Sequence, residues 1–163
     1  MKILVTGSKG QLGNEIRVLS KQFPGPEYVF VDVDELDITD NNAVQQFFTK
    51  HQFDICINCA AYTAVDKAES DATMAQKINV TGVEYLANAC QKNDAVLFHI
   101  STDFVFDGNA TAPIEVDAPV SPISVYGQTK AEGEYRALSL NKKTILIRTS
   151  WVYSFFGNNF VKT

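Results

Sequence analysis

The sequence predicts an α/β fold, a doubly wound parallel sheet with helices on both faces. Short apolar runs alternate with polar or helix-periodic stretches, as expected for repeated strand–helix–strand units. The runs are nearly continuous in apolar residues and rich in β-branched side chains, which is typical of strands buried on both faces. These five runs are Ile3–Val5, Val29–Val31, Ile55–Ile57, Val96–Ile100 and Ile145–Ile147.

Helical periodicity between the runs predicts the helices. Asp40 and Asp71 stand where two helices would begin, because a short acidic side chain can cap free backbone N–H groups. Prolines interrupt the segment 107–122, so we expect a long loop there, of the kind that often carries substrate contacts. The expected helices are Gln11–Lys21, Asn41–Lys50, Asp71–Lys92 and Val125–Leu140.

Size and charge limit the possible functions. The 163 residues fit one domain, 1–163, and the net charge of −5 argues against a general attraction to nucleic acid or to an anionic membrane. No apolar run is long enough to span a bilayer, and the first residues lack the apolar stretch of a signal peptide. We therefore expect a cytoplasmic protein with no membrane or nucleic-acid partner.

Glycines follow the first apolar run at a spacing typical of dinucleotide sites. Gly7, Gly10 and Gly13 form a GxxGxxG turn between a predicted strand and a predicted helix. Such glycines allow a sharp turn, close approach to a pyrophosphate and tight packing of helix against strand. The spacing alone is weak, but a strand, a helix and a later carboxylate accompany it in order. We therefore expect a Rossmann-like NAD(P)-binding domain.

That carboxylate is Asp32, which follows the second apolar run and is placed to hydrogen-bond an adenosine ribose. An unpaired Asp near a 2′-phosphate would repel it, which favours NADH. Lys9, inside the glycine turn, offers a cation to phosphate and favours NADPH. We expect both cofactors to be used.

A candidate catalytic set follows the long loop. Tyr126 and Lys130 are four residues apart, and therefore share one face of the predicted helix. A tyrosine has a pKa near ~10 in water, and a nearby ammonium would stabilise its phenolate. Thr102, at the end of the fourth strand, can hydrogen-bond a carbonyl oxygen. As an isolated pair, Tyr126 and Lys130 would suggest only the surface of an amphipathic helix. His99, inside the fourth strand, is expected to be a core residue.

The cysteines raise an alternative that we consider weaker. Cys56 and Cys59 have the CxxC spacing of redox and zinc sites, and Cys90 is the third cysteine. No second CxxC or His pair follows, and odd spacing on a strand sends side chains to opposite faces. We expect these residues to act as small hydrophobes and expect no metal site in the chain.

Several motifs in register resemble the extended short-chain dehydrogenase/reductases, and more closely the dTDP-4-dehydrorhamnose reductase family. The resemblance covers the whole chain. Besides the glycine turn and the YxxxK pair, it rests on Asn58–Glu69, Ser101–Gly108, Pro122–Lys130 and Arg148–Tyr153.

This resemblance implies reduction of the 4-keto group of dTDP-4-dehydro-L-rhamnose by NADPH or NADH, a step of dTDP-rhamnose biosynthesis. It implies a proton donor in Tyr126, an electrostatic partner and ribose ligand in Lys130, and a carbonyl-oxygen ligand in Thr102. The implied cofactor contacts are Gly7, Gly10, Gln11, Leu12 and Gly13 at the pyrophosphate, Asp37 and Ile38 near adenine, and Ala60, Ala61 and Thr63 centrally. The implied substrate positions are Val65, Asp103, Phe104 and Trp151.

The sequence departs from this family in two respects. Phe104 stands where many relatives have Tyr, which removes one hydroxyl that could bind sugar. Family members also continue well past Thr163, so we expect the chain to be the N-terminal part of a longer enzyme, without the smaller substrate domain and inactive alone. The family's Mg²⁺-linked homodimer uses an acidic residue matched by Glu15, so Mg²⁺ and dimerisation are expected only in the full-length protein.

Two other functions remain open at this point. A different nucleotide-sugar epimerase, dehydratase or reductase would use the same cofactor fold, although a dehydratase would be expected to have Glu where Phe104 stands. A regulatory role is the second, because the beta subunit of methionine adenosyltransferase resembles these reductases and acts by binding a partner.

Overall fold

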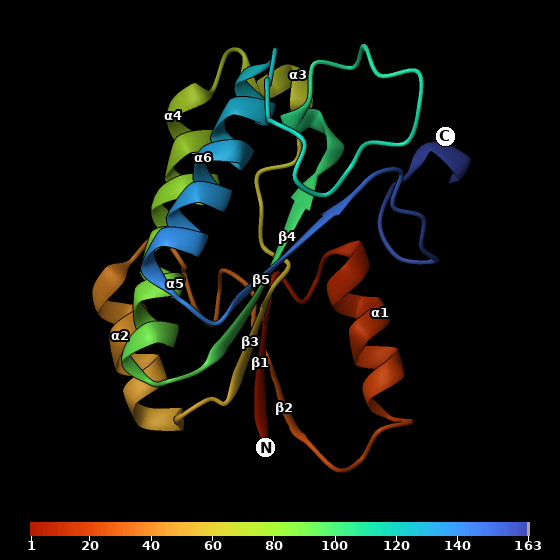
Figure 1. Cartoon of the computed structure of the whole chain (residues 1–163). Helices are drawn as coiled ribbons and strands as arrows, with labels where there is room; N and C mark the ends of the chain where they lie inside the picture. Colours follow the sequence, from red (N-terminus) through yellow and green to blue (C-terminus); the bar gives the residue numbers. More distant parts are fainter. Residues whose placement is uncertain (163) are drawn as a thin grey trace.

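The computed structural model describes residues 1–162 and contains one five-stranded sheet. All strands are parallel, in the order β2-β1-β3-β4-β5. The predicted α/β class is therefore confirmed, and the carboxyl ends of all five strands lie at one edge of the sheet (Figure 1). The strands are β1 (Lys2–Thr6), β2 (Glu27–Phe30), β3 (Ile55–Asn58), β4 (Val96–Thr102) and β5 (Thr144–Thr149).

Helices lie on both sides of this sheet. Helix α1 covers one face, and α2, α5 and α6 cover the other (Figure 1). The main hydrophobic core joins the second group to the sheet, where Leu4, Phe48, Leu86 and Leu97 are fully buried. The longer helices are α1 (Gln11–Ser20), α2 (Asn41–His51), α5 (Val83–Lys92) and α6 (Val125–Leu140); the short ones are α3 (Val65–Ala68), α4 (Ala72–Gln76), η2 (Asp103–Val105) and η3 (Phe160–Lys162).

The helix starts agree with the sequence better than the helix interiors do. Helix α6 has both predicted ends, and the Ser124 hydroxyl caps it by accepting from Gly127 N at 3.1 Å. Asp40 caps α2 by accepting from Ala43 N at 3.0 Å, as expected. The helix expected over 71–92 is present as one continuous helical run, formed by α4, a π-helical turn η1 (Lys77–Gly82) and α5; it begins after Asp71, although the Asp71 side chain does not cap it.

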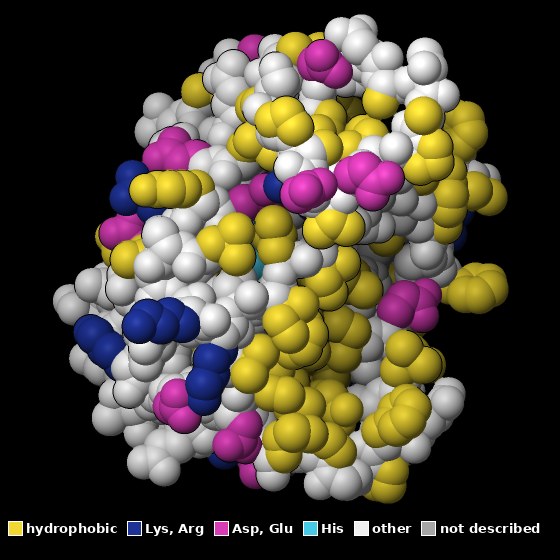
Figure 2. All heavy atoms as spheres, in the orientation of Figure 1, with side chains coloured by type: hydrophobic (Ala, Val, Ile, Leu, Met, Phe, Trp, Pro, Cys, Tyr) yellow, Lys and Arg dark blue, Asp and Glu magenta, His cyan; other side chains and the backbone are white. Residues whose placement is uncertain are grey.

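The prediction of full burial on both faces is wrong for β5. Ile145 and Ile147 remain 46% and 41% exposed, on the same face as their pairing partners Phe98 and Ile100 in β4. No helix within residues 1–162 packs over that part of the sheet, and Figure 2 shows hydrophobic side chains gathered over the strands next to α1. None of the helices in the described range is long and apolar enough to cross a membrane.

Helix α6 approaches the π-helical turn so closely that only glycine fits between them. A Cβ added at Gly133 would lie 2.1 Å from the backbone oxygen of Asn79. Because backbone atoms on both sides resist movement, a methyl group there must separate the two elements. The close contact fixes α6, which carries the candidate catalytic residues, against η1.

We therefore expect Gly133→Ala to lower the free energy of unfolding by about 1–3 kcal/mol, despite the better helix propensity of alanine. Gly25→Ala is the matched control, because a Cβ there meets nothing within 4 Å. It should change stability by less than about 0.5 kcal/mol. Urea unfolding of both variants makes the measurement, and equal stabilities would show that the helix contact is not tight.

Candidate active site

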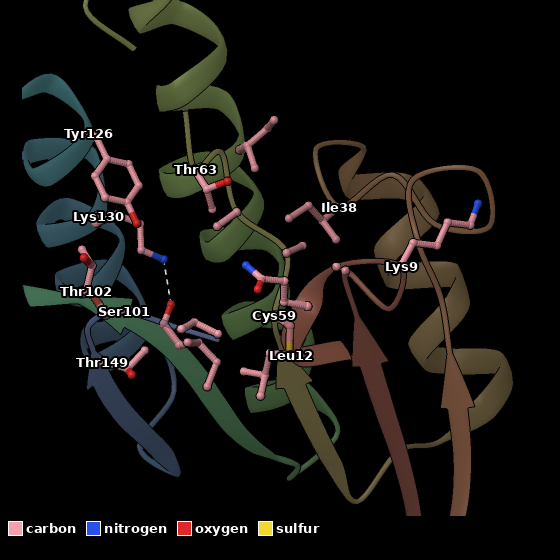
Figure 3. A pocket seen from close by; sticks show the side chains of 18 of the residues that line it. Lys9, Leu12, Ile38, Cys59, Thr63, Ser101, Thr102, Tyr126, Lys130 and Thr149 are labelled. Atoms are coloured by element: carbon pink, nitrogen blue, oxygen red, sulfur yellow. Dashed lines mark hydrogen bonds between the residues drawn. The ribbon is translucent and has the colours of Figure 1, made fainter. Parts of the chain in front are cut away.

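One cavity of about 630 Å³ lies at the carboxyl edge of the sheet. That volume is within the range of small-molecule and cofactor sites. All the cofactor, catalytic and substrate positions named above line this cavity except Gly13. In Figure 3, Tyr126, Lys130 and Thr102 lie at one side of it, and Ile38 and Lys9 lie at the other. The fold thus brings together segments from both ends of the chain.

The glycine turn after β1 forms the floor of the cavity. Gly7 has a φ of +61°, and a Cβ there would lie 2.6 Å from Ala60 N. A larger residue at this position would therefore clash with the segment that follows β3. Gly13 lies beneath the turn, where a Cβ would lie 2.5 Å from the Gly7 oxygen. Its position therefore serves the packing of α1, while Gly7 and Gly10 border the cavity.

The N-terminus of α1 at Gly10 has the properties of an anion site. Gly10 is the N-cap residue of α1, no side chain accepts a hydrogen bond from the first turn, and that turn contains no acidic residue. The first N–H groups of a helix have no intrahelical acceptors, and the helix dipole favours negative charge there. This end of the cavity is suited to hold a pyrophosphate.

The loop after β2 carries several acidic side chains. Asp32 accepts from Lys9 N and from Val33 N, each at 2.9 Å. The Lys9 ammonium pairs with Asp34 at 2.5 Å and has Glu35 at 4.0 Å. The hydrogen bond to Asp34 raises the pKa of Lys9, and both side chains are solvent-exposed. The cation that could favour a 2′-phosphate is therefore already engaged by a carboxylate.

At the opposite end, Lys130 is buried at 2% exposure, and its ammonium donates to the Ile100 carbonyl at 2.7 Å (Figure 3). Burial lowers the pKa of Lys130 to about 8, while the Glu134 charge acts in the opposite direction. The ammonium form is thus retained at neutral pH. The Thr102 hydroxyl donates to Asp103 at 3.1 Å and accepts from Phe104 N at 3.2 Å.

The pKa of Tyr126 is shifted by groups other than Lys130. Burial raises the pKa of Tyr126, the charge of Asp103 also raises it, and a hydrogen bond with Thr102 lowers it. The Lys130 ammonium binds the Ile100 carbonyl rather than the phenol. Stabilisation of the phenolate by Lys130 during the reaction stays a prediction, while burial favours the protonated phenol, which is able to donate a proton.

Aromatic side chains border the catalytic end. The Phe104 ring meets the Tyr126 ring edge to face, with centroids 5.6 Å apart. Trp151 is 66% exposed and meets Phe160 edge to face at 5.5 Å. Its φ of 52° is unusual for a bulky residue. Trp151 therefore lies at the rim of the cavity and presents an open aromatic face.

The sequence analysis missed Asn79, which is 1% exposed on the π-helical turn. Its amide donates to Thr129 Oγ1 and to the Tyr62 carbonyl, each at 3.1 Å, and its oxygen accepts from Tyr62 N at 2.8 Å. Asn79 therefore ties the segment after β3 to α6. An amide on an otherwise apolar helix face was the available signal. The buried Glu134 and its partly buried partner Arg148 were also missed.

The structure places the remaining candidates away from catalysis. His99 is fully buried, and burial followed by the Lys130 charge lowers its pKa to about 3, as suits a neutral core residue. Burial raises the pKa of Cys59 to about 12, and a hydrogen bond with Cys90 and burial raise that of Cys56. Thiolate chemistry is disfavoured there.

Glu15, the residue matched to the family's metal-linked dimer, accepts from the Ser154 hydroxyl at 2.7 Å. Within residues 1–162, no group of three or more His, Cys, Asp or Glu side chains is arranged to hold a metal ion. The predicted role of Glu15 in a full-length dimer stays a prediction.

Known proteins similar to this chain share one description. The chain matches the family described as the RmlD substrate binding domain over residues 1–163. It is 41% identical to a dTDP-4-dehydrorhamnose reductase of Aggregatibacter actinomycetemcomitans over 99% of this chain and 55% of that protein. It is 42% identical to one of Streptomyces griseus, over 97% of this chain and 52% of that protein. The chain thus spans about half the length of these curated relatives.

Two solved structures have the same architecture. A dTDP-4-dehydrorhamnose reductase from Clostridium acetobutylicum is 49% identical, with a TM-score of 0.94 over 99% of this chain and 57% of that one. Another, from Bacillus anthracis in complex with NADP, is 38% identical, with the same TM-score and the same coverage of each chain.

The buried Lys130 makes stability depend on pH in a direction that follows from its pKa. The folded-state value of about 8 lies below the ordinary value of 10.5, so between these limits the unfolded chain binds more protons. Stability contributed through this group therefore rises with pH across that window, by up to about 1.4 kcal/mol per pH unit.

We expect the free energy of unfolding of the wild type, relative to Lys130→Met, to increase by about 1–2 kcal/mol between about pH 8 and about pH 9.5. Urea titrations at each pH provide the difference, with exposed Lys67→Met as the control. A difference that does not vary with pH would contradict the buried ammonium.

Proposed function

The chain belongs to the RmlD substrate binding domain family, and from this premise we propose that it forms the NAD(P)H-binding and catalytic part of a dTDP-4-dehydrorhamnose reductase. The reaction is reduction of the 4-keto group of dTDP-4-dehydro-L-rhamnose to give dTDP-L-rhamnose. The substrate is thus a nucleotide sugar, bound beside the dinucleotide.

One observation carries this proposal. The glycine turn and the set of Thr102, Tyr126 and Lys130 line opposite parts of the same cavity. A dinucleotide whose pyrophosphate lay at the N-terminus of α1 could extend along the carboxyl edge and place its nicotinamide near Tyr126. The uncapped helix start and the Gly7 turn fit such a ligand, and a relative with the same architecture was solved with NADP.

Bound NADPH or NADH supplies the hydride that reduces the sugar C4. Tyr126, kept protonated by burial, donates its phenolic proton to the carbonyl oxygen, so that the ketone becomes an alcohol. Thr102 would donate a hydrogen bond to the same oxygen as negative charge develops on it, by turning its hydroxyl hydrogen from Asp103 to the substrate. The charged Lys130 would hold the nicotinamide ribose and stabilise the phenolate that Tyr126 becomes once it has given up its proton.

We propose that both cofactors bind at this site. Asp32, Asp34 and Glu35 disfavour a 2′-phosphate, while Lys9 can contact one only by leaving Asp34. Because that ion pair is exposed, its partners can exchange readily. Preference between NADH and NADPH should accordingly be modest.

The burial of Lys130 supports an enzyme over a purely regulatory protein. An ammonium at 2% exposure costs stability, as its lowered pKa indicates. A protein that acted only by binding a partner would gain nothing from that cost. The Mg²⁺-linked homodimer of the full-length protein and its cytoplasmic location remain predictions.

The first test is dinucleotide binding by this chain. We expect calorimetry to detect binding of both NADH and NADPH, because the glycine turn, Asp32 and the segment after β3 are all present. Gly10→Ala should weaken both affinities by about tenfold, since its methyl group obstructs approach of the pyrophosphate to the backbone. Gly25→Ala should bind as the wild type does. A folded wild type that binds neither cofactor would refute the site.

The second test concerns the proton donor, in the full-length protein. Tyr126→Phe removes only the transferable proton, so turnover should fall by about 10²–10⁴-fold with little change in NADPH affinity. Lys130→Met should lower both turnover and affinity. NADPH oxidation with saturating dTDP-4-dehydrorhamnose gives the rates, and wild-type turnover in Tyr126→Phe would remove Tyr126 from the mechanism.

A further inference from the structure

The buried carboxylate of Glu134 lies next to the catalytic set but has no place in the mechanism above. Tyr126, Lys130 and Glu134 occur at successive intervals of four residues on α6, so they share one face of that helix. Glu134 is only 4% exposed. A carboxylate is seldom buried to this extent unless it is paired, and burying the pair is itself costly.

Three hydrogen bonds fix this carboxylate. Arg148 on β5 donates to it through two nitrogens, at 3.0 and 2.7 Å, and the Ser101 hydroxyl donates at 2.5 Å. The Arg148 guanidinium also lies over the Phe106 ring, 5.1 Å from its centroid. Because Ser101 and Arg148 are pairing partners in neighbouring strands, Glu134 joins β4, β5 and α6 at one point.

Consecutive residues of β4 meet the catalytic face of α6. The Ile100 carbonyl accepts from the Lys130 ammonium, and the next residue, Ser101, donates to Glu134. Thr102, the residue after Ser101, lowers the pKa of Tyr126. A change at Glu134 therefore acts on the strand segment that also holds Lys130 and Tyr126.

We infer that Glu134, anchored by Arg148 and Ser101, is a positioning residue that keeps the Lys130 side chain protonated and seated on the Ile100 carbonyl. The importance of this role for turnover rests on the proposed function. Its effect on Lys130 does not, because it concerns two side chains of this chain alone.

The other groups near Lys130 cannot replace Glu134. Those on β4 and the turn after it are His99, which is neutral, and Asp103, which is exposed and beside Tyr126. Cys59, after β3, is a protonated thiol, and Tyr126 is a protonated phenol. Among residues 1–162, the charged side chain that partners Glu134 is Arg148, which is positive. Without the carboxylate, Lys130 would face burial and a second cation.

The direct test is the pKa of Lys130, measured by NMR titration of protein labelled with ¹³Cε-lysine and assigned through Lys130→Met. Glu134→Gln keeps the size of the side chain and one acceptor oxygen but removes the charge. It should lower the pKa of Lys130 from about 8 by about 1. Glu132→Gln is the matched control, because Glu132 is on the same helix but pairs with Arg136 at the surface. That variant should leave Lys130 unchanged.

A second variant keeps the test decisive if Glu134→Gln does not fold. Arg148→Gln removes the neighbouring cation while leaving an amide that can donate to Glu134. It should raise the pKa of Lys130, the opposite direction to Glu134→Gln. An ion pair that did not act on the charge of Lys130 would give no such opposed shifts, and an unchanged pKa of Lys130 in either folded variant would overturn the inference.

Turnover separates this inference from the proposed function. In the full-length enzyme, Glu134→Gln should move the alkaline limb of the kcat profile to lower pH by about one unit, as Lys130 loses its proton earlier. Turnover with an unmoved limb and an unmoved pKa of Lys130 would refute the role of Glu134 and leave the reductase standing. Shifted pKa values of Lys130 without any turnover in the wild type would support the role of Glu134 and refute the proposed reductase.

Discussion

Parallel pairing of the five strands is the constraint on which the site depends. In-register pairing of β1 with β3, β3 with β4 and β4 with β5 brings Thr6, Asn58 and Thr102 to one edge of the sheet. Their buried side chains extend this alignment, since Thr6 donates to Asn58 at 2.6 Å and Asn58 lies 3.1 Å from His99. Every loop that lines the cavity leaves from this edge, so the sheet positions the glycine turn, the acidic loop and the catalytic helix together.

Charge burial at the catalytic end opposes stability. Lys130 and Glu134 are both nearly inaccessible to solvent, and burial lowers the pKa of the Lys130 ammonium to about 8. A core of apolar residues at these positions would often be at least as stable. The arrangement is explained if the ammonium must be dry and fixed to act on a tyrosine and a ribose. The Glu134–Arg148 pair then supplies a local field that solvent cannot supply.

Local signals predicted the elements of the fold but not the contacts between them. The strands, both ends of α6 and the Asp40 cap follow from apolar periodicity and capping chemistry within a few residues. The close contact between the π-helical turn and Gly133 joins residues far apart in the sequence, and the exposure of β5 depends on which helices cover it. The Lys130–Ile100 bond joins residues 30 apart, and neither residue type signals it. The glycine spacing and the YxxxK pair could predict residues that line the cavity. The roles of Asn79 and Glu134 could not be predicted, because they depend on tertiary contacts.

The central claim is that one ligand spans the cavity from the N-terminus of α1 to Tyr126. A crystal structure of the protein with NADPH tests it most directly. The account predicts pyrophosphate oxygens on the backbone N–H groups around Gly10, a ribose on Lys130 and the nicotinamide ring beside Tyr126. A dinucleotide bound elsewhere, or bound with its nicotinamide turned away from Tyr126 and Lys130, would contradict it.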